Sequence, residues 1–513
     1  MKPIFSILLI IVPAMVTSVS FAQTPCENLT SLNLPGTTIS FARGVEPGPF
    51  QPPDAPGRGP AAPVNLPAHC RVAAVLKPSP DSGIEMEVWL PTAWNGKFQA
   101  VGNGGFAGSI TYIPGGGGAV TSSMATALQQ GYATASTDTG HKGGGGSFAY
   151  EHPERFTDFS WRAVHEMTVE AKALIKAFYG KVPSLSYWNS CSNGGRQGLM
   201  EAQRFPADFD GILAGSAVMN WTGRATQAIW VAHAEHETEA AFIPPAKYPA
   251  LHKAAVEKCD ELDGVRDGII ENPVRCQFDP GVMLCKDADN PACLTAPQVE
   301  TARKIYTPAS NPKSGKEFYP GLEPGSELGW ATYGSPRPFG IADDHFKYVV
   351  FQDPNRDYMK FDFDGDLALA ERIGKGTVDA LDPNLKDFFA HGGKLLQYQG
   401  WNDPQVLPLN SVRYYTSVVE AMGGASRISD SYRLFMVPGM AHCGGGEGPN
   451  RFDGFGALTN WVENGKAPDQ MLASRVTGGK TDRTRPLCPY PRTPVYKGTG
   501  STDDAANFAC MMP

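Results

Sequence analysis

Two kinds of hydrophobic pattern alternate along the first part of the chain. Short runs that are apolar or strictly alternating predict strands, and longer segments with apolar residues at helical spacing predict helices. Strands are predicted at 72–76, 84–90, 97–101, 132–136 and 184–189, and helices at 124–130, 161–179 and 195–205. Alternating strands and helices form a mostly parallel sheet that is covered by helices on both faces. The pattern therefore predicts an α/β fold.

This regular alternation stops near residue 220. The stretch 220–380 contains helical patterns, Pro-rich loops and an acidic turn. Strand patterns return at 394–398 and 432–437, with a predicted helix at 410–422 between them. The return of the same pattern predicts one α/β domain that is interrupted by a large insertion.

These boundaries divide the chain into an α/β domain of residues 23–219 and 381–513 and an inserted domain of residues 220–380. Residues 41–66 are rich in Pro and Gly. Such composition is typical of loops, so we expect an extended surface segment there.

The N-terminus has the features of an export signal. Lys2 precedes an apolar run over 4–16, which is followed by Ser20-Phe21-Ala22. A positive start, a short apolar stretch and small residues before the cleavage site are typical of a signal peptide. The run is too short to span a membrane and contains Pro13. We expect residues 1–22 to be removed from a secreted or periplasmic protein.

Composition and charge narrow the class of protein. The chain has 513 residues, of which 42% are hydrophobic, so it can bury a substantial core. The formal net charge is −8, and no run of Lys and Arg provides the basic surface that nucleic-acid binding requires. No other segment resembles a membrane span. The even number of cysteines, 10, suits disulfide bonding in an exported protein.

A candidate nucleophile lies between a predicted strand and a predicted helix. Ser192 is flanked two residues away by Ser190 and Gly194. This matches the G-x-S-x-G turn of α/β-hydrolases with Ser in place of the first Gly, and the small residues let strand and helix approach each other. An ordinary Ser/Gly turn is the alternative interpretation.

An acid and a base follow two later predicted strands. Asp403 follows the strand at 394–398, and His442 follows the strand at 432–437. The order Ser, Asp, His is the α/β-hydrolase order. We therefore expect Ser192 to attack the substrate carbonyl, His442 to take and return the proton, and Asp403 to orient His442.

Two cysteines provide an independent check on this triad. Cys191 adjoins the candidate nucleophile, and Cys443 adjoins the candidate base. If Ser192 and His442 share a hydrogen bond, the neighbouring Cα atoms can fall within the roughly 4.4–6.8 Å that a disulfide needs. Such a bond would join two catalytic loops that are far apart in sequence.

The glycine-rich segment 102–108 is a candidate for half of an oxyanion hole. Such a hole needs two backbone N–H groups directed at the developing negative charge. The residue after the nucleophile, Asn193, is expected to supply one. Gly104 and Gly105 are both candidates for the other.

An acidic turn lies within the insertion. Asp260, Asp263 and Asp267 are closely spaced around two glycines. Hard oxygen ligands in one short turn suit Ca²⁺, although the spacing is not that of an EF-hand. From spacing alone, a solvated acidic turn is an equally good interpretation.

These motifs together resemble the tannase and feruloyl esterase family of α/β-hydrolases, which also includes mono(2-hydroxyethyl) terephthalate hydrolase. The resemblance extends over nearly the whole mature chain. It rests on GNGGFAG at 102–108, Cys-Ser-x-Gly-Gly-Arg at 191–196, Gly-Trp-x-Asp-Pro at 400–404 and Gly-Met-x-His-Cys at 439–443. It implies the α/β-hydrolase fold, the same triad, a Cys191–Cys443 disulfide and an insertion that acts as a lid domain over the active site.

The resemblance also implies a metal site and further disulfides. The calcium site, structural and in the lid, would be formed by the side chains of Asp260, Asp263 and Asp267 and the carbonyls of Val265 and Ile269. The implied disulfides are Cys26–Cys70, Cys259–Cys276, Cys285–Cys293 and Cys488–Cys510.

The function expected from these features is that of a secreted serine carboxylic ester hydrolase acting through an acyl-enzyme. The resemblance implies esters of aromatic acids as substrates. Among these, feruloyl or other hydroxycinnamoyl esters, of small molecules or of plant polymers, are expected first. Galloyl esters or a terephthalate monoester are alternatives. A different class of function would be a calcium-stabilised carbohydrate-binding protein that has lost catalysis, but the intact triad argues against it. The aromatic residues Trp330, Tyr333, Phe339 and Phe346 could line a substrate pocket or form the core of the lid.

Overall fold

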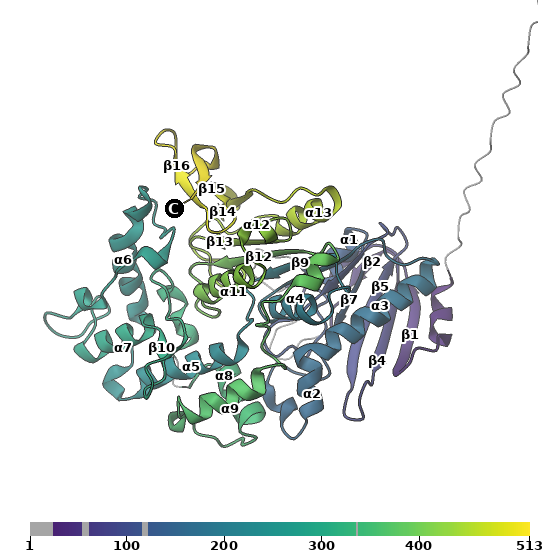
Figure 1. Cartoon of the computed structure of the whole chain (residues 1–513), viewed down its shortest axis with the longest axis horizontal. Coiled ribbons are helices and arrows are strands. Elements are labelled where there is room, and N and C mark those ends of the chain that lie inside the picture. Colours follow the sequence, from purple (N-terminus) through teal and green to yellow (C-terminus); the bar gives the residue numbers. More distant parts are fainter. Residues whose placement is uncertain (1–23, 54–60, 115–121, 335–336, 513) are drawn as a thin grey trace, which may run out of the picture.

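The computed structural model describes residues 24–53, 61–114, 122–334 and 337–512 (Figure 1). The predicted export signal lies outside these residues. Within them, no helix has both the length and the apolar character needed to cross a membrane.

The centre of the molecule is a nine-stranded sheet with the strand order β1-β4-β5-β7-β6-β8-β9-β12-β13. Strands β1 to β7 in this order pair antiparallel, and β7 to β13 pair parallel. The strands are β1 (Thr37–Val45), β4 (His69–Leu76), β5 (Ile84–Pro91), β6 (Phe98–Val101), β7 (Ala133–Thr137), β8 (Ser186–Cys191), β9 (Gly211–Gly215), β12 (Lys394–Gly400) and β13 (Tyr432–Val437). The parallel half brings the carboxyl ends of β8, β12 and β13 to one edge, where the candidate triad lies.

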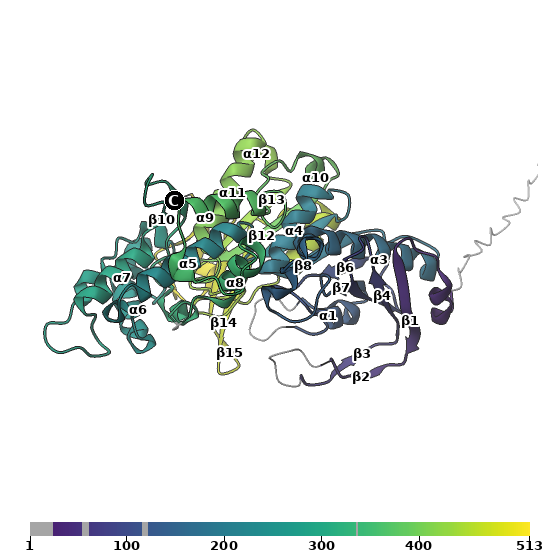
Figure 2. The ribbon, with the colours of Figure 1, turned by 90° about the horizontal axis from the view of Figure 1, so that it is seen from below.

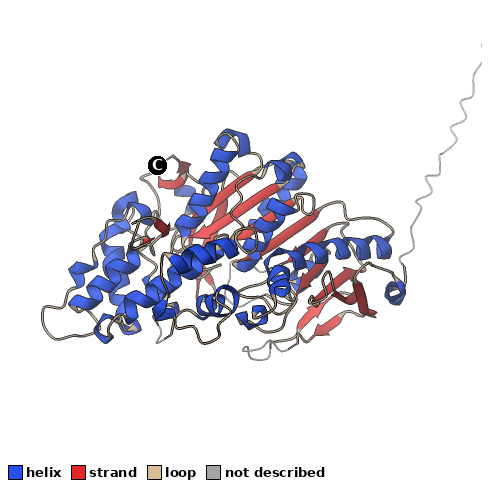
Figure 3. Cartoon of the chain, turned by 60° about the horizontal axis from the view of Figure 1, so that its bottom comes forward, coloured by secondary structure: helices blue, strands red, loops and turns tan. Residues whose placement is uncertain are grey.

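Helices pack on both faces of this sheet (Figure 3). On β12, Leu395 packs in one cluster with Val418, and the next residue, Leu396, packs in another with Trp461. Because successive side chains of a strand point to opposite faces, these clusters are the two faces of the sheet. The first face carries α3 (Ala163–Tyr179), α4 (Asn193–Arg204) and α11 (Pro408–Ala421), and the second carries α1 (Met124–Gln129) and α13 (Gly454–Asn464). Shorter helices are α2 (Pro153–Thr157), α10 (Lys386–Ala390) and α12 (Ala425–Ile428).

The insertion has a hydrophobic core of its own. Trp330, Tyr333 and Phe346 are buried in this core, and Phe339 packs against it. These aromatic side chains therefore build the lid. In Figures 1 and 2 the lid helices lie together at one end of the molecule, beside β12 and α11. They are α5 (Trp221–His236), α6 (Tyr248–Cys259), α7 (Ala296–Tyr306), α8 (Gly340–Asp344) and α9 (Gly365–Gly374), with the small hairpin β10 (Ala309–Ser310) and β11 (Glu317–Tyr319).

Two parts of the sheet differ from the sequence prediction. Residues 41–45, expected in an extended surface segment, belong to β1, an edge strand of the sheet that pairs with β4 along its whole length and leaves Arg43 and Gly44 exposed. The Pro- and Gly-rich segment after them contains a hairpin of β2 (Gly48–Phe50) and β3 (Val64–Leu66), held by Phe50 against Trp89 with ring centroids 5.0 Å apart. Strand β9 has no counterpart in the prediction, because its five residues begin and end with glycine and pairing with β8 and β12 defines it.

The C-terminal region adds two hairpins that the sequence prediction does not include. They are β14 (Met471–Thr477) with β15 (Lys480–Leu487), and β16 (Thr493–Tyr496) with β17 (Phe508–Met511). The Cys488–Cys510 disulfide holds the second hairpin to the end of β15.

Candidate active site

Ser192 lies on the sharp turn between β8 and α4. Its φ is +64°, a left-handed conformation that is rare for a residue other than glycine. A Cβ at Gly194 would overlap the hydroxyl of Ser190, and a Cβ at Gly195 would lie 2.5 Å from the carbonyl oxygen of Gly215. The two glycines therefore allow α4 to start close to the sheet, and the turn holds Ser192 Oγ above the strand ends.

The structure brings the three residues of the candidate triad together. Ser192 Oγ lies 2.9 Å from Nε2 of His442, and Nδ1 of His442 lies 2.8 Å from Oδ2 of Asp403. With the imidazole proton on Nδ1, His442 donates to Asp403 and accepts from Ser192. His442 retains 14% exposure of its side chain, whereas the side chain of Asp403 is fully buried. The arrangement can remove a proton from Ser192 and return it to a leaving group.

Asp403 is fixed by its own loop and by β12. Its Oδ1 accepts hydrogen bonds from the backbone N–H groups of Gln405 at 2.9 Å and Val406 at 3.0 Å. Its Oδ2 accepts from Nε2 of Gln399 at 2.9 Å as well as from His442. Gln399 is absent from the sequence prediction, although a glutamine at the end of a buried strand is the kind of polar position that needs a partner.

A disulfide joins the turn that carries Ser192 to the loop that carries His442. The Cα atoms of Cys191 and Cys443 are 6.0 Å apart. The backbone N–H of Cys443 also donates to the hydroxyl of Ser216, which follows β9, at 3.3 Å. The loop after β13 is thus attached to two neighbouring strand ends.

The other disulfides implied by the family resemblance are also present. They are Cys26–Cys70, Cys259–Cys276, Cys285–Cys293 and Cys488–Cys510. All ten cysteines are therefore paired.

The predicted oxyanion residues lie beside the turn. Asn193 is fully buried at the first position of α4. The loop after β6 packs against this helix start, since a Cβ on Gly102 would lie 2.9 Å from Cα of Gly194. Among the described residues, no acceptor takes a hydrogen bond from the backbone N–H of Asn193, Gly104 or Gly105. These N–H groups are available to a ligand.

Arg196 supports Asn193 from within the helix, a role that the sequence prediction lacks. It is fully buried, and its Nε donates to Oδ1 of Asn193 at 2.7 Å. Its Nη1 donates to the carbonyl of Ser160 at 2.7 Å, and its guanidinium lies 5.1 Å from the ring centroid of Phe159. Burial lowers the pKa of Arg196 to about 9, because no carboxylate pairs directly with it. A buried arginine in the Cys-Ser-x-Gly-Gly-Arg motif is a signal that could have indicated this role.

The lid contacts the loops that carry Asp403 and His442. On the loop of Asp403, Nε of Arg224 from α5 donates to the carbonyl of Gln405 at 2.9 Å. On the loop of His442, Nε2 of His252 from α6 lies 2.6 Å from Oε2 of Glu447. His252 is bound at its other nitrogen by Glu327, at 2.9 Å. The lid is therefore joined by hydrogen bonds to the two loops that carry the acid and the base.

The acidic turn of the lid lies outside the triad. Asp260 is buried, and its Oδ1 accepts hydrogen bonds from the backbone N–H groups of Asp267, Gly268 and Ile269 at 3.1–3.2 Å. The Cys259–Cys276 disulfide encloses this turn.

The charges and carbonyls of this turn fit a hard cation. Burial, together with the charge of Asp267, raises the pKa of Asp263 to about 6. Among the described residues, none donates a hydrogen bond to the carbonyl of Val265 or Ile269. Asp267 pairs with Arg485, so one carboxylate already faces a protein cation. Carboxylates and free carbonyls are the ligand chemistry that Ca²⁺ takes, although the carboxylate oxygens of Asp260, Asp263 and Asp267 do not all lie within 4.8 Å of one another in this structure.

Comparison with known proteins finds a family model and relatives that cover most of the chain. Residues 70–511 match the family described as "Tannase and feruloyl esterase". An uncharacterized esterase of Xanthomonas campestris is 38% identical over 97% of this chain and 93% of its own length. A probable feruloyl esterase B-2 of Neosartorya fischeri is 34% identical over 86% of each chain.

Solved structures show the same fold. Feruloyl esterase B from Aspergillus oryzae superimposes with a TM-score of 0.87 at 32% identity, over 95% of this chain and 99% of that chain. Tannin acyl hydrolase from Aspergillus niger, at 22% identity, has a TM-score of 0.76 over 96% and 94% of the two chains, which shows a shared fold. This protein, an α/β-hydrolase with a large inserted lid, belongs to the tannase and feruloyl esterase family.

Proposed function

We propose that this protein is an exported serine hydrolase that cleaves esters of aromatic carboxylic acids through an acyl-enzyme. The observation that carries the proposal is the continuous hydrogen-bonded chain from Ser192 through His442 to Asp403. The relatives named feruloyl esterases support the class of substrate.

In this proposal, a group on this chain carries out each step of the reaction. Ser192 Oγ attacks the ester carbonyl while Nε2 of His442 takes its proton, and Asp403 stabilises the imidazolium. The N–H of Asn193, with that of Gly104 or Gly105, holds the negative oxygen of the tetrahedral intermediate. His442 then protonates the departing alcohol. Water, deprotonated by His442, attacks the acyl-enzyme, releases the acid and restores the Ser192 hydroxyl.

Replacing the proposed nucleophile, Ser192, tests the covalent mechanism. Ser192→Ala is expected to lower kcat by roughly 10⁴-fold or more, because the covalent step is lost. Circular dichroism and the melting temperature should match those of the parent, since the methyl group of Ala fits the same turn. Hydrolysis at the parental rate by a folded Ser192→Ala protein would refute the assignment.

The same variant separates catalysis from binding. If the chain were a carbohydrate-binding protein without catalysis, Ser192→Ala and its parent would bind plant polysaccharide equally and neither would release acid from an ester. The proposal expects acid release by the parent alone.

Feruloyl and other hydroxycinnamoyl esters are the proposed substrates. The relatives at 34% and 32% identity are named feruloyl esterases, whereas the tannin acyl hydrolase is 22% identical. A panel of methyl ferulate, chlorogenate, methyl gallate and a terephthalate monoester, compared by kcat/KM, tests this order. A higher kcat/KM for the gallate or the terephthalate ester would replace the feruloyl assignment.

A structural Ca²⁺ in the acidic turn is part of the proposal. Asp260, Asp263 and Asp267 would hold it with the carbonyls of Val265 and Ile269, supported by the free carbonyls and the raised pKa of Asp263. When bound, the ion would neutralise the turn and hold its ligands together. The residues of the reaction itself lie elsewhere, so no step of catalysis depends on the ion.

Export is supported by the cysteines. All ten are paired in five disulfides, a state that persists in oxidising compartments. We propose a secreted or periplasmic location, to which the predicted signal of residues 1–22 would direct the chain. N-terminal sequencing of the exported protein tests this: a mature chain that starts at Gln23 supports it, and an intact Met1 contradicts it.

A further inference from the structure

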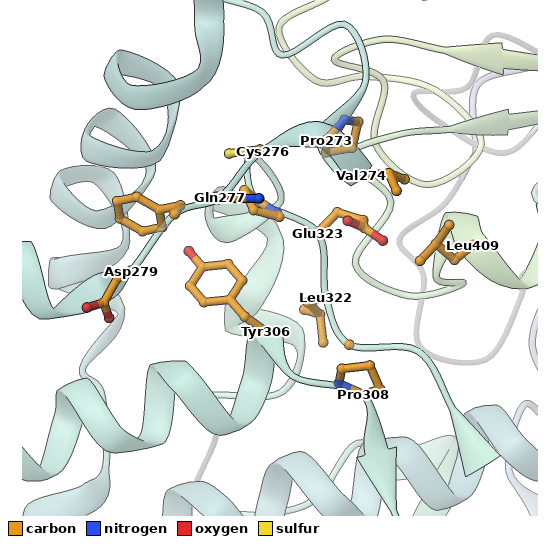
Figure 4. Close-up of a pocket in the computed structure, with 13 residues that line it drawn as sticks. Pro273, Val274, Cys276, Gln277, Asp279, Tyr306, Pro308, Leu322, Glu323 and Leu409 are labelled. Atoms are coloured by element: carbon orange, nitrogen blue, oxygen red, sulfur yellow. The ribbon is translucent and has the colours of Figure 1, made fainter. Parts of the chain in front are cut away.

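A pocket in the lid is separate from the catalytic triad (Figure 4). It has a volume of about 430 Å³, and none of Ser192, Asp403 and His442 lines it. Its walls come from the loop 273–279, the end of α7, the segment 321–324 and the start of α11. Sites for small ligands typically have volumes of roughly 300–1,000 Å³, so the space suits a compact molecule.

Glu323 is a buried polar residue of this pocket whose carboxylate lacks a partner among the described residues. Its side chain is one of those that line the pocket, and the residue is only 7% exposed. Figure 4 shows its carboxylate between the side chains of Val274, Leu322 and Leu409. No described residue donates a hydrogen bond to this carboxylate or forms an ion pair with it. The nearby guanidinium of Arg413 is already paired with Glu317.

Burying such a group without a partner costs free energy. Burial raises the pKa of Glu323 to about 7, against the opposing charge of Arg413. An unpaired buried carboxylate makes the folded state less stable than an apolar side chain in the same place would. A ligand that pairs with it would remove this cost.

The other walls define what kind of ligand fits. The rings of Phe278 and Tyr306 lie 5.9 Å apart and nearly perpendicular, and the Tyr306 hydroxyl already donates to Glu327. Asp279 is at the rim and is paired with Arg303. No Lys, Arg or His is among the described residues that line the pocket. The unpaired carboxylate of Glu323, the aromatic rings and the lack of a basic residue among the described lining residues together favour a cation, because aromatic faces attract cations as carboxylates do.

We propose that this pocket binds a small organic cation, a primary ammonium on an aromatic or aliphatic body. The ammonium would pair with Glu323, and the body would pack against Tyr306 and Leu322. This inference does not depend on the proposed ester hydrolysis.

Three ligands of similar size and different charge test it: benzylamine, benzyl alcohol and benzoate. Each is titrated into the full chain at about pH 8, where Glu323 is mostly ionised, by calorimetry and ligand-observed NMR. Every titration is repeated after Ser192 has been blocked by an aryl phosphonate. We expect saturable binding of benzylamine in both forms, binding of benzyl alcohol weaker by roughly 10-fold or more, and no binding of benzoate.

Two matched variants locate the site. Glu323→Gln keeps the shape of the side chain and removes its charge, and should weaken benzylamine binding by roughly 10-fold or more. Asp279→Asn, at the rim, should change it by less than about 2-fold. Equal binding of benzyl alcohol and benzylamine, loss of benzylamine binding when Ser192 is blocked, or an unchanged affinity in Glu323→Gln would each overturn the proposal. Parental melting temperatures for both variants exclude misfolding as the cause.

Discussion

At the scale of single residues, the acid of the triad is the most completely bonded group in the site. Asp403 accepts from two backbone N–H groups, from Gln399 and from His442. The carboxylate cannot rotate without losing one of these bonds, so the orientation of His442 toward Ser192 depends on all of them. Two of these four donors are side chains, Gln399 and His442.

Gln399→Met is therefore expected to lower kcat by about 10-fold with little change in KM. The change removes a donor that supports Asp403 when His442 carries its positive charge, which happens in the transition state and not in the bound ester. Steady-state kinetics on methyl ferulate measures both constants.

Ser411→Ala is the matched control. Ser411 donates to Oε1 of Gln399 at 3.0 Å and does not touch Asp403. It should keep kcat within about 3-fold of the parent. Equal losses of kcat in the two variants would show that packing around the end of β12, rather than the hydrogen bond to Asp403, carries the effect.

At the scale of elements, the Cys191–Cys443 disulfide holds the turn between β8 and α4 to the loop after β13. The two cysteines are 252 residues apart, and Ser192 and His442 are their immediate neighbours. A crosslink over so long a loop restricts the unfolded chain strongly, and here it also fixes the distance between nucleophile and base.

Replacing both cysteines by alanine is expected to lower the free energy of unfolding by up to about 5 kcal/mol and kcat by about 10-fold or more. The matched control is the double alanine variant of Cys488 and Cys510, which are 22 residues apart and enclose none of the triad residues. It should lose up to about 3 kcal/mol and keep its kcat. Parental kcat in a folded variant without the Cys191–Cys443 bond would show that hydrogen bonds alone position His442.

The acidic turn of the lid allows the proposed calcium site to be tested by removing the ion. If Ca²⁺ is bound there, chelation should lower the melting temperature by about 5 °C or more, because the ion stabilises only the folded turn. Asp263→Asn is the control. Because this variant has lost one of the proposed Ca²⁺-binding side chains, chelation should lower its melting temperature by less. An unchanged melting temperature after metal analysis has shown that the ion is gone would contradict the calcium proposal.

Some strands of the sheet and some residues of the candidate site can be predicted from the sequence, and others cannot. Strands β8, β12 and β13 have clear apolar patterns, and the residues after them include Ser192, Asp403 and His442, so both the fold and the candidate triad could be predicted. Strand β9 could not, because Gly211–Gly215 becomes a strand through its neighbours rather than through its own pattern. Gln399 and Arg196 carry weaker signals, a glutamine at the end of a predicted strand and an arginine within a motif, but their partners could not be predicted, because no spacing encodes the geometry of a hydrogen bond.

At the scale of the whole molecule, the lid and the α/β domain each have a hydrophobic cluster, share a third one that includes Phe106, Phe159 and Trp221, and also meet through specific polar contacts. His252 makes one of them, between Glu327 of the lid and Glu447 on the loop after His442. Burial alone would lower the pKa of His252, but the hydrogen bonds and charges of the two glutamates outweigh it and raise the pKa to about 9. The charged imidazolium therefore holds the lid to the loop that carries His442.

This contact makes the stability of the protein depend on pH. Because the folded pKa of His252 lies above its unfolded value near 6.5, its contribution is fully present below about pH 6.5 and is lost as the pH rises through about 9. Solvent screening at the half-exposed Glu447 reduces the contribution to about 1–2 kcal/mol. The measurement is urea unfolding of the parent and of His252→Gln at about pH 6, 7.5 and 9.5. The difference between the two proteins should be about 1–2 kcal/mol at the lowest pH and should nearly vanish at the highest. If the contact to the loop of His442 carries the effect, the free energies of unfolding of Glu447→Gln and the parent should also converge as the pH rises. If instead the difference between His252→Gln and the parent does not change with pH, His252 stabilises the lid by packing alone.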